Sequence, residues 1–205
     1  MGDRPVDVSA SLADQTLAIG VGANLGDPLA TLLALRPLLE QRLVALLGAG
    51  RCRWSPLFRT APVGGPPGQP AYLNAALVGA LPEGAGAAAW GAPGHPDPQA
   101  LLAELLALER RFGRVRRERW GPRHLDLDLL WCGPQRLRLA ELELPHPRLL
   151  ERAFVLAPLA AIDPQLQLPG AAGTVAKRLA ALPTPAGVPP PERLPARAGW
   201  PEGSP

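Results

Sequence analysis

The alternation of apolar and polar positions along the chain predicts four main strands and four helices. Short apolar runs between turn residues indicate strands, and leucines that recur every three or four positions indicate helices. The expected strands cover residues 17–21, 51–59, 73–81 and 125–131, and residues 137–144 form a short edge strand or hairpin. The expected helices cover residues 28–47, 98–112, 146–161 and 175–182.

Local signals at the helix ends support this division. Asp27 suits the N-cap of the first helix, and Pro28 suits its first position, where the missing N–H costs no hydrogen bond. Pro37 should kink that helix or split it in two. Gly113 should end the helix that begins at Pro98.

The order of these elements, βαββαβ with helices added after it, matches the split βαβ arrangement of ferredoxin-like domains. We therefore expect an α+β fold with a ferredoxin-like core. The extra helices should complete a three-layer α-β-α sandwich.

Composition indicates how the chain is organised around this core. With 205 residues and 47% hydrophobic content, the chain is long enough for one domain with an ordinary core. Its 27 prolines and 22 glycines gather in expected loops and near the C-terminus. We expect a flexible leader at 1–16, one domain at 17–182 with a surface insertion near 82–98, and a disordered proline-rich tail at 183–205.

Charge and cysteine content leave the class of partner open but favour a soluble, cytoplasmic protein. The net charge of +3 does not by itself call for nucleic acid as a partner. Apolar runs stay below the ~18–20 residues that span a bilayer, and the N-terminus lacks the apolar stretch of a signal peptide. Cys52 and Cys132 have no CxxC partner, which favours free thiols in a reducing compartment.

Two aspartates in the last main strand form the first candidate site. Asp126 and Asp128 alternate with leucines, so both side chains should project from one face, with Cα atoms ~6.5–7 Å apart. Two such carboxylates repel each other unless a cation lies between them, and Mg²⁺ prefers oxygen ligands. Taken alone, the alternation favours an amphipathic edge strand with two solvated aspartates, because such alternation is common.

A cluster of arginines beside this strand favours the metal site. Seven arginines lie between Arg110 and Arg123. Arg110 and Arg111 end a helix, where the helix dipole alone favours cations. The others follow Gly113 in a loop, and guanidinium groups match phosphate oxygens. A nucleic-acid patch would explain the arginines but not the paired aspartates, so we expect a metal–nucleotide site.

Other sequence features limit how a nucleotide could bind. The chain lacks the G-x-x-x-x-G-K-[ST] loop, and the spacing of Gly20, Gly22 and Gly26 misses the dinucleotide fingerprint by one position. Side chains must therefore hold the phosphates. His146 lies between two prolines and is either a structural residue or a phosphate donor; too few acidic residues lie nearby for a convincing zinc site.

Four blocks in order carry a resemblance to a known family. They are AIGVGANLGD, FRTAPVGGPPGQPAYLNAA, RVRRERWGPRHLDLDLLW and LPHPRLLERAFVLAPL, and together they span about residues 17–182. The chain resembles the 6-hydroxymethyl-7,8-dihydropterin pyrophosphokinases. The resemblance implies transfer of diphosphate from ATP to the hydroxymethyl group of the dihydropterin, which yields AMP and the pterin diphosphate in folate biosynthesis. It also implies an α-β-α sandwich around a ferredoxin-like core.

The resemblance also implies roles for individual residues. Asp126 and Asp128 look like ligands of two Mg²⁺ ions. Arg114 and Arg123 resemble the catalytic arginines that hold phosphate oxygens. The further residues that resemble nucleotide-binding positions are Glu109, Arg116, Trp120, His146 and Arg152. The residues that resemble pterin-binding positions are Thr60, Val63, Tyr72, Asn74 and Phe154.

We expect small-molecule substrates, ATP and a dihydropterin, for a monomer that binds neither nucleic acid nor membrane. Two rival functions remain open from the sequence. An ordinary kinase or nucleotide hydrolase would use the same arginines and aspartates but release ADP. An RNA-binding module on a ferredoxin-like sheet would carry aromatics on its strand faces.

Overall fold

The computed structural model describes residues 15–47, 51–81, 97–113, 121–184 and 187–200. Almost all of the expected leader at 1–16 and of the expected insertion at 82–98 therefore lies outside the described residues.

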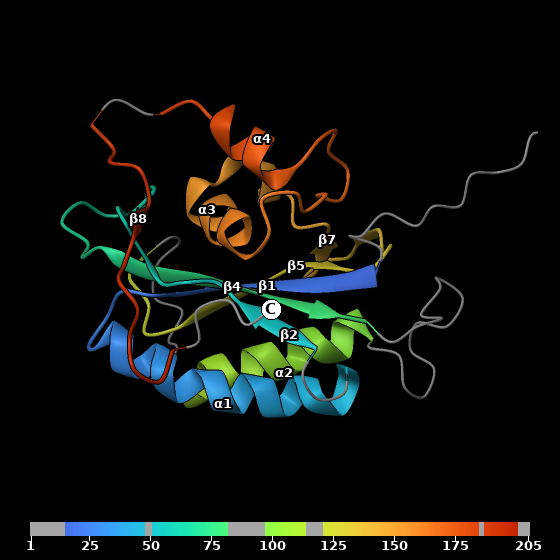
Figure 1. Cartoon of the computed structure of the whole chain (residues 1–205). Coiled ribbons are helices and arrows are strands. Elements are labelled where there is room, and N and C mark those ends of the chain that lie inside the picture. The colour runs from blue at the N-terminus through green and yellow to red at the C-terminus, as the bar shows by residue number, and fades with distance from the viewer. Residues whose placement is uncertain (1–14, 48–50, 82–96, 114–120, 185–186, 201–205) are drawn as a thin grey trace, which may run out of the picture.

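A six-stranded sheet forms the middle of the molecule (Figure 1). Its main path runs β5-β1-β4-β3-β8, and β2 also pairs with β4. Each of these pairs is antiparallel. The strands are β1 (Thr16–Ala23), β2 (Cys52–Trp54), β3 (Phe58–Thr60), β4 (Tyr72–Ala80), β5 (Asp126–Cys132) and β8 (Glu192–Arg193).

Helices cover both faces of this sheet (Figure 1). One face carries α1 (Pro28–Leu47) and α2 (Pro98–Arg111), and the other carries α3 (Ala153–Ile162) and α4 (Val175–Ala180). A short 3₁₀ helix, η3 (Leu149–Glu151), precedes α3, and β6 (Leu137–Arg138) pairs with β7 (Glu143–Leu144) in a separate small sheet. The expectation of an α+β fold is therefore confirmed.

The central strands divide their side chains between two cores. Leu17, Ile19 and Val21 of β1 belong to the larger cluster, which also contains the buried leucines of α1 and α2. Ala18 of β1 and Ala76 of β4 belong to the smaller cluster, with residues of α3 and α4. Because side chains alternate along a strand, the second face also receives the side chains of Asn74, Asp126 and Asp128.

The start of α1 forms as its sequence predicts. The Asp27 carboxylate accepts a hydrogen bond from the backbone N–H of Ala30 (2.9 Å), which satisfies one of the unpaired donors of the first turn. The helix then continues through Pro37 to Leu47 without a break. Of the two outcomes expected for Pro37, a split into two helices is wrong.

The expected single strand at 51–59 is also wrong. Two short strands, β2 and β3, pair with β4 and are separated at Ser55, Pro56 and Leu57. Pro56 has no N–H to give to a ladder. The Ser55 hydroxyl accepts a hydrogen bond from the N–H of Ala76 (2.9 Å) and thereby maintains the connection to β4.

The helix expected at 146–161 begins later than predicted, at Ala153. Pro147 and the hydrogen bond from the N–H of Arg148 to Nδ1 of His146 (3.1 Å) favour a turn, which the short 3₁₀ helix η3 follows before α3 begins.

The expectation of a disordered tail is wrong for residues 187–200. Glu192 and Arg193 form β8 against β3, and both Leu194 and Trp200 are buried. Hydrophobic anchors separated by prolines do not show helical or strand periodicity, which explains why the sequence pattern missed them.

Among the described residues, none of the helices combines the length and the apolar character needed to cross a membrane.

The register of β1 generates a testable prediction. Gly22 lies opposite Asn74, and a Cβ atom at this position would approach Oδ1 of Asn74 to 2.7 Å. A Cβ atom at Gly20 would meet Leu130 at no closer than 3.6 Å, which is an ordinary contact. We expect Gly22→Ala to lower the free energy of unfolding by about 1–3 kcal/mol relative to Gly20→Ala. Urea unfolding of the two variants measures the difference, and equal stabilities would contradict the assigned register.

Candidate functional site

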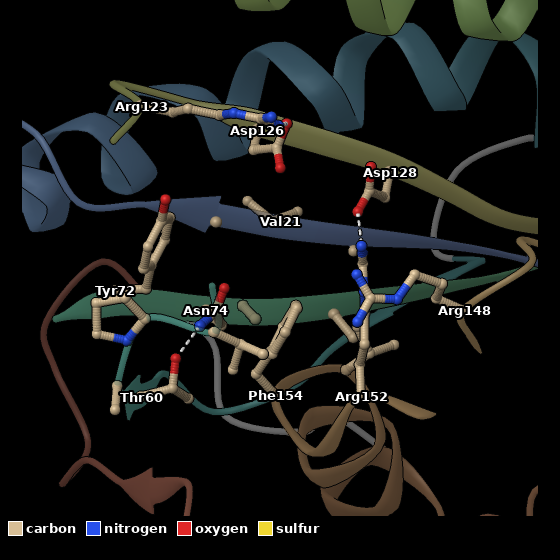
Figure 2. A pocket seen from close by; sticks show the side chains of 18 of the residues that line it. Val21, Thr60, Tyr72, Asn74, Arg123, Asp126, Asp128, Arg148, Arg152 and Phe154 are labelled. Carbon is tan, nitrogen blue, oxygen red and sulfur yellow. Dashed lines mark hydrogen bonds and ion pairs between the residues drawn. The ribbon is translucent and has the colours of Figure 1, made fainter. Parts of the chain in front are cut away.

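A cavity of about 270 Å³ opens on the sheet face that carries α3 (Figure 2). The ends of β3, β4 and β5 contribute to its wall, together with the middle of β1 and the segment that leads into α3. Its described lining includes Thr60, Val63, Tyr72, Asn74, Arg123, Asp126, Asp128, His146, Arg148, Arg152 and Phe154. Most of the residues that the sequence analysis selected therefore lie around one space.

Two glycines of β1 keep the middle of this space open. Gly22 pairs with Asn74 on one side and with Asp126 on the other. Gly20 pairs in the same way with Asp128 on β5. Because glycine has no side chain, the groups on β4 and β5 face a common gap across β1.

Asp126 and Asp128 project from β5 on the same face, as their spacing predicts (Figure 2). Asp126 pairs with Arg123, and Oδ2 of Asp128 lies 3.3 Å from the guanidinium of Arg152. The side chains of Asp126 and Asp128 are 25% and 30% exposed, so solvent and a ligand can both reach them. β5 is an end strand of the described sheet, as the interpretation of an amphipathic edge strand expected, but it lines a cavity and both acids have guanidinium partners, so the two aspartates are not simply solvated.

The two carboxylates suit a hard divalent cation. The described residues contain no group of three or more His, Cys, Asp or Glu side chains that could hold a metal ion by themselves. Mg²⁺ is commonly held by one or two carboxylates together with phosphate oxygens and water. The donors of this cavity therefore fit a cation that arrives with a phosphate ligand.

The opposite end of the cavity suits a flat, hydrogen-bonding molecule. Nδ2 of Asn74 donates to Oγ1 of Thr60 at 2.6 Å, and both residues are buried. The Thr60 hydroxyl accepts this bond and keeps its own proton to donate. Tyr72 and Phe154 lie on either side of Asn74 (Figure 2). Burial raises the pKa of the Tyr72 hydroxyl, so its ring stays neutral at physiological pH.

Arg152 connects the two ends of the cavity. Its guanidinium carbon lies 5.4 Å from the centre of the Phe154 ring, within the range of a cation–π contact. The same group pairs with Asp128. The aromatic and carboxylate parts of the site are therefore held at a fixed spacing by one side chain.

His146 is held as a neutral donor. Burial, together with the nearby positive charges of Arg152 and Arg148, lowers its pKa to about 4. Its Nδ1 accepts a hydrogen bond from the N–H of Arg148, so the proton of the neutral ring resides on Nε2. His146 can thus donate one hydrogen bond without adding charge.

A second cavity of about 990 Å³ adjoins the first and shares Asp128 and His146 with it. Its walls include Leu102, Leu106 and Leu129, which makes part of it apolar. Glu109 also lines this cavity, although the residue as a whole is buried. One of its oxygens accepts a hydrogen bond from the N–H of Leu127 (2.8 Å), so Glu109 also anchors β5 between the two aspartates.

Three of the expected site residues, Arg114, Arg116 and Trp120, lie outside the described residues. Arg123, at the end of the same arginine-rich stretch, does reach the cavity.

The sequence analysis missed two residues that shape the site. Arg148 lines the first cavity, and its position two residues after His146 was the available signal. Asn24 is buried at the end of β1, where its oxygen accepts from the N–H of Arg123 (2.7 Å) and its amide donates to the carbonyl of Pro70 (3.1 Å). The sequence analysis did not select Asn24, because nothing local indicates partners so distant in sequence.

The lowered pKa of His146 predicts a pH dependence of stability. An unperturbed histidine titrates near pH 6.5, so the unfolded chain binds a proton before the folded protein does as the pH falls. Stability should therefore decline between about pH 6.5 and pH 4. NMR titration of the His146 ring should give a midpoint near pH 4, and His146→Gln should lose less stability than the wild type across this range. A midpoint near 6.5 would contradict the assignment.

Comparisons with known proteins identify relatives of this chain. A relative from Synechocystis sp. is 38% identical over 157 residues, which cover 77% of this chain and 71% of the relative. One from Pseudomonas aeruginosa is 41% identical over 159 residues, which cover 76% and 85%. Both are named 2-amino-4-hydroxy-6-hydroxymethyldihydropteridine pyrophosphokinase.

Solved structures show the same fold at low sequence identity. The Plasmodium falciparum HPPK-DHPS A437G structure with STZ-DHP superposes with a TM-score of 0.54 at 12% identity, over 85% of this chain and 46% of the Plasmodium chain. The chain thus spans less than half of that larger protein. The family model for 7,8-dihydro-6-hydroxymethylpterin-pyrophosphokinase (HPPK) matches residues 18–164, and the chain belongs to this family.

Proposed function

We propose that this protein transfers diphosphate from ATP to the hydroxymethyl group of 6-hydroxymethyl-7,8-dihydropterin, a step of folate biosynthesis. The observation that carries the proposal is the layout of the first cavity. A buried Asn74–Thr60 pair beside two aromatic rings lies at one end, and two carboxylates with arginine partners lie at the other. Pterin and polyphosphate need these two environments next to each other.

The pterin is assigned to the end of the cavity that contains Asn74. A pterin ring presents several hydrogen-bond donors and acceptors along one edge, and the Asn74 amide and Thr60 hydroxyl offer both kinds of group. Tyr72 and Phe154 would stack on its two faces, which favours a flat heterocycle. Val63 is 55% exposed at the mouth of the cavity, where its backbone can contact the bound ring.

The nucleotide is assigned to the second cavity, with its phosphates directed toward the first. Leu102, Leu106 and Leu129 offer apolar contacts to a purine base. His146 borders both cavities, so its Nε2 proton can be donated to a phosphate oxygen. Arg123, Arg148 and Arg152 supply positive charge where the triphosphate would enter the first cavity.

Asp126 and Asp128 are the residues that would hold magnesium, with two ions as the expected number. When bound there with ATP, magnesium neutralises phosphate charge and makes the β-phosphorus a better electrophile.

The proposed reaction forms one bond and breaks one. The hydroxymethyl oxygen of the pterin attacks the β-phosphorus, and the bond from this phosphorus to the oxygen bridging the α- and β-phosphates breaks, so that AMP leaves. The hydroxyl proton is lost to solvent or a phosphate oxygen. Among the described residues, we assign the main contribution to positioning and to guanidinium charge rather than to a strong general base.

We also assign the core to the ferredoxin-like arrangement. If β2 and β3 count as one interrupted strand, the chain order of the core strands is β1, β2/β3, β4, β5, and their spatial order begins β5-β1-β4-β3. That is the order in which two split βαβ units interlock. The α-β-α layering follows from the helices on both faces (Figure 1).

The products of the reaction test the proposed function. Purified protein incubated with Mg²⁺, ATP and 6-hydroxymethyl-7,8-dihydropterin should form AMP and the pterin diphosphate in equal amounts. Chromatography with phosphorus NMR identifies both. Formation of ADP would support an ordinary kinase or hydrolase instead, and AMP formation independent of the pterin would also contradict the proposal.

Substitution of the two aspartates tests the metal assignment. We expect Asp126→Asn and Asp128→Asn to lower kcat by at least about 100-fold, because metal-based charge stabilisation contributes several kcal/mol. Glu104→Gln, which alters an exposed pair with Arg42 away from the cavity, is the matched control and should retain activity. Near-normal turnover in either aspartate variant, with a fold that circular dichroism shows to be intact, would remove the metal assignment.

A further inference from the structure

The C-terminal segment lies beyond the residues that the family model matches, yet it packs against the sheet. The match ends at residue 164, whereas β8 begins at Glu192. β8 pairs with β3 in the registers Phe58–Arg193 and Arg59–Glu192. The N–H of Leu194 then donates to the carbonyl of Leu57 (2.8 Å).

Trp200 provides the firmest anchor of this segment. It is 5% exposed, and its ring meets Trp54 edge to face at 5.1 Å between centroids. Its Nε1 proton is donated to the carbonyl of Ser55 at 2.8 Å in a buried position. The segment thus contacts the interruption between β2 and β3 at both of its ends, Ser55 and Leu57.

This interruption determines where β3 lies. β3 has three residues and pairs on its inner side with β4 alone, through three residue pairs. So short a strand gains little stability from one ladder. The neighbouring Ser55 makes two hydrogen bonds to Ala76 of β4: its N–H donates to the Ala76 carbonyl, and its hydroxyl accepts from the Ala76 N–H. The C-terminal segment adds the contacts on the outer side.

Thr60 is the last residue of β3 and the partner of Asn74 in the pterin end of the cavity. A small displacement of β3 would lengthen this 2.6 Å hydrogen bond. It would also change how the hydrogen-bonding groups of Thr60 and Asn74 are arranged toward the cavity. By contrast, Asp126 and Asp128 lie in β5, which forms the opposite end of the described sheet and pairs with β1, not with β3.

We propose that residues 192–200 act as a positioning segment for pterin binding: by holding β3 from its outer side, they keep Thr60 against Asn74. Trp200 and Leu194 are its positioning residues. The proposal rests on the proposed function, since it assigns the pterin to the Asn74–Thr60 end of the cavity. The proposal predicts different effects on the two substrates: loss of the Trp200 anchor weakens the affinity for the pterin and leaves the affinity for the nucleotide unchanged.

Binding measurements on Trp200 variants test this separation. The dissociation constant of 6-hydroxymethyl-7,8-dihydropterin is measured by fluorescence with saturating α,β-methylene-ATP and Mg²⁺, and that of α,β-methylene-ATP by calorimetry. Trp200→Ala should weaken pterin binding by about tenfold, the effect of impairing one hydrogen-bonded contact, and change nucleotide binding by less than about twofold. Trp200→Phe keeps an aromatic ring but lacks the N–H, so it should give an intermediate loss.

Glu192→Gln is the control within the same segment. It removes the charge of an exposed pair with Arg59 whose side chains are 53% and 60% exposed, and such pairs contribute little. Both dissociation constants should stay at the wild-type value. All measurements are made at about 20 °C below the lowest melting temperature, so that unfolding does not contribute.

The outcomes separate this inference from the proposed function. If the wild type does not bind the pterin, the proposed function itself is wrong. If the wild type binds the pterin and Trp200→Ala binds each ligand as tightly as the wild type does, but has a lower melting temperature, the segment only stabilises the fold. The inference is then wrong. A parallel loss of affinity for both ligands overturns it as well. Faster amide hydrogen exchange in residues 58–60 of Trp200→Ala, together with the selective loss, supports it.

Discussion

The site depends on one constraint, the absence of side chains at two positions of β1. Gly22 lies between Asn74 on β4 and Asp126 on β5, and Gly20 occupies the equivalent place beside Asp128. A shift of one residue in either ladder would turn these groups toward the core under α1 and α2. Ile19, Val21 and Ala23, which alternate with the glycines, are buried in that core, and this makes the register costly to change. Packing on one face of the sheet thus determines the chemistry on the other.

The charges of the cavity follow from the same arrangement. Two carboxylates on one strand face would repel each other, and the pairing of Asp126 with Arg123 and of Asp128 with Arg152 offsets that repulsion. Burial is the main reason that the pKa of His146 is lowered and the ring stays neutral, and the positive charges of Arg152 and Arg148 act in the same direction. A charged substrate and its metal ions would enter a space whose own charges already alternate. Binding can then proceed by exchange of partners instead of by burial of isolated charges.

The parts of the fold that were predicted from the sequence are those with local signals. The alternation in Asp126-Leu127-Asp128 specifies one strand face, and Asp27-Pro28 specifies a helix start, because both depend on neighbouring residues. The errors concern distant contacts. Arg123 donates its N–H to Asn24, 99 residues earlier, and Trp200 donates to Ser55, 145 residues earlier. Pro56 interrupts a strand that its apolar neighbours predict, and the serine hydroxyl that compensates is recognisable only once Ala76 lies beside it.

The strands that carry the two ends of the cavity differ in length and in the contacts that hold them. The carboxylates belong to a seven-residue strand paired with the long inner strand β1, and the Glu109 carboxylate anchors the backbone between them. Thr60 ends a three-residue strand near the edge of the sheet, where unpaired backbone groups also invite association with other chains. A segment that covers this edge can both support β3 and prevent such association. β8 occupies the outer hydrogen-bonding positions of β3, and Trp200 donates a hydrogen bond to the adjoining turn. Under the proposed function, variation in the C-terminal segment should then alter recognition of the heterocycle before it alters the phosphate chemistry, because the segment covers β3 and the carboxylates lie on β5 at the opposite end of the sheet.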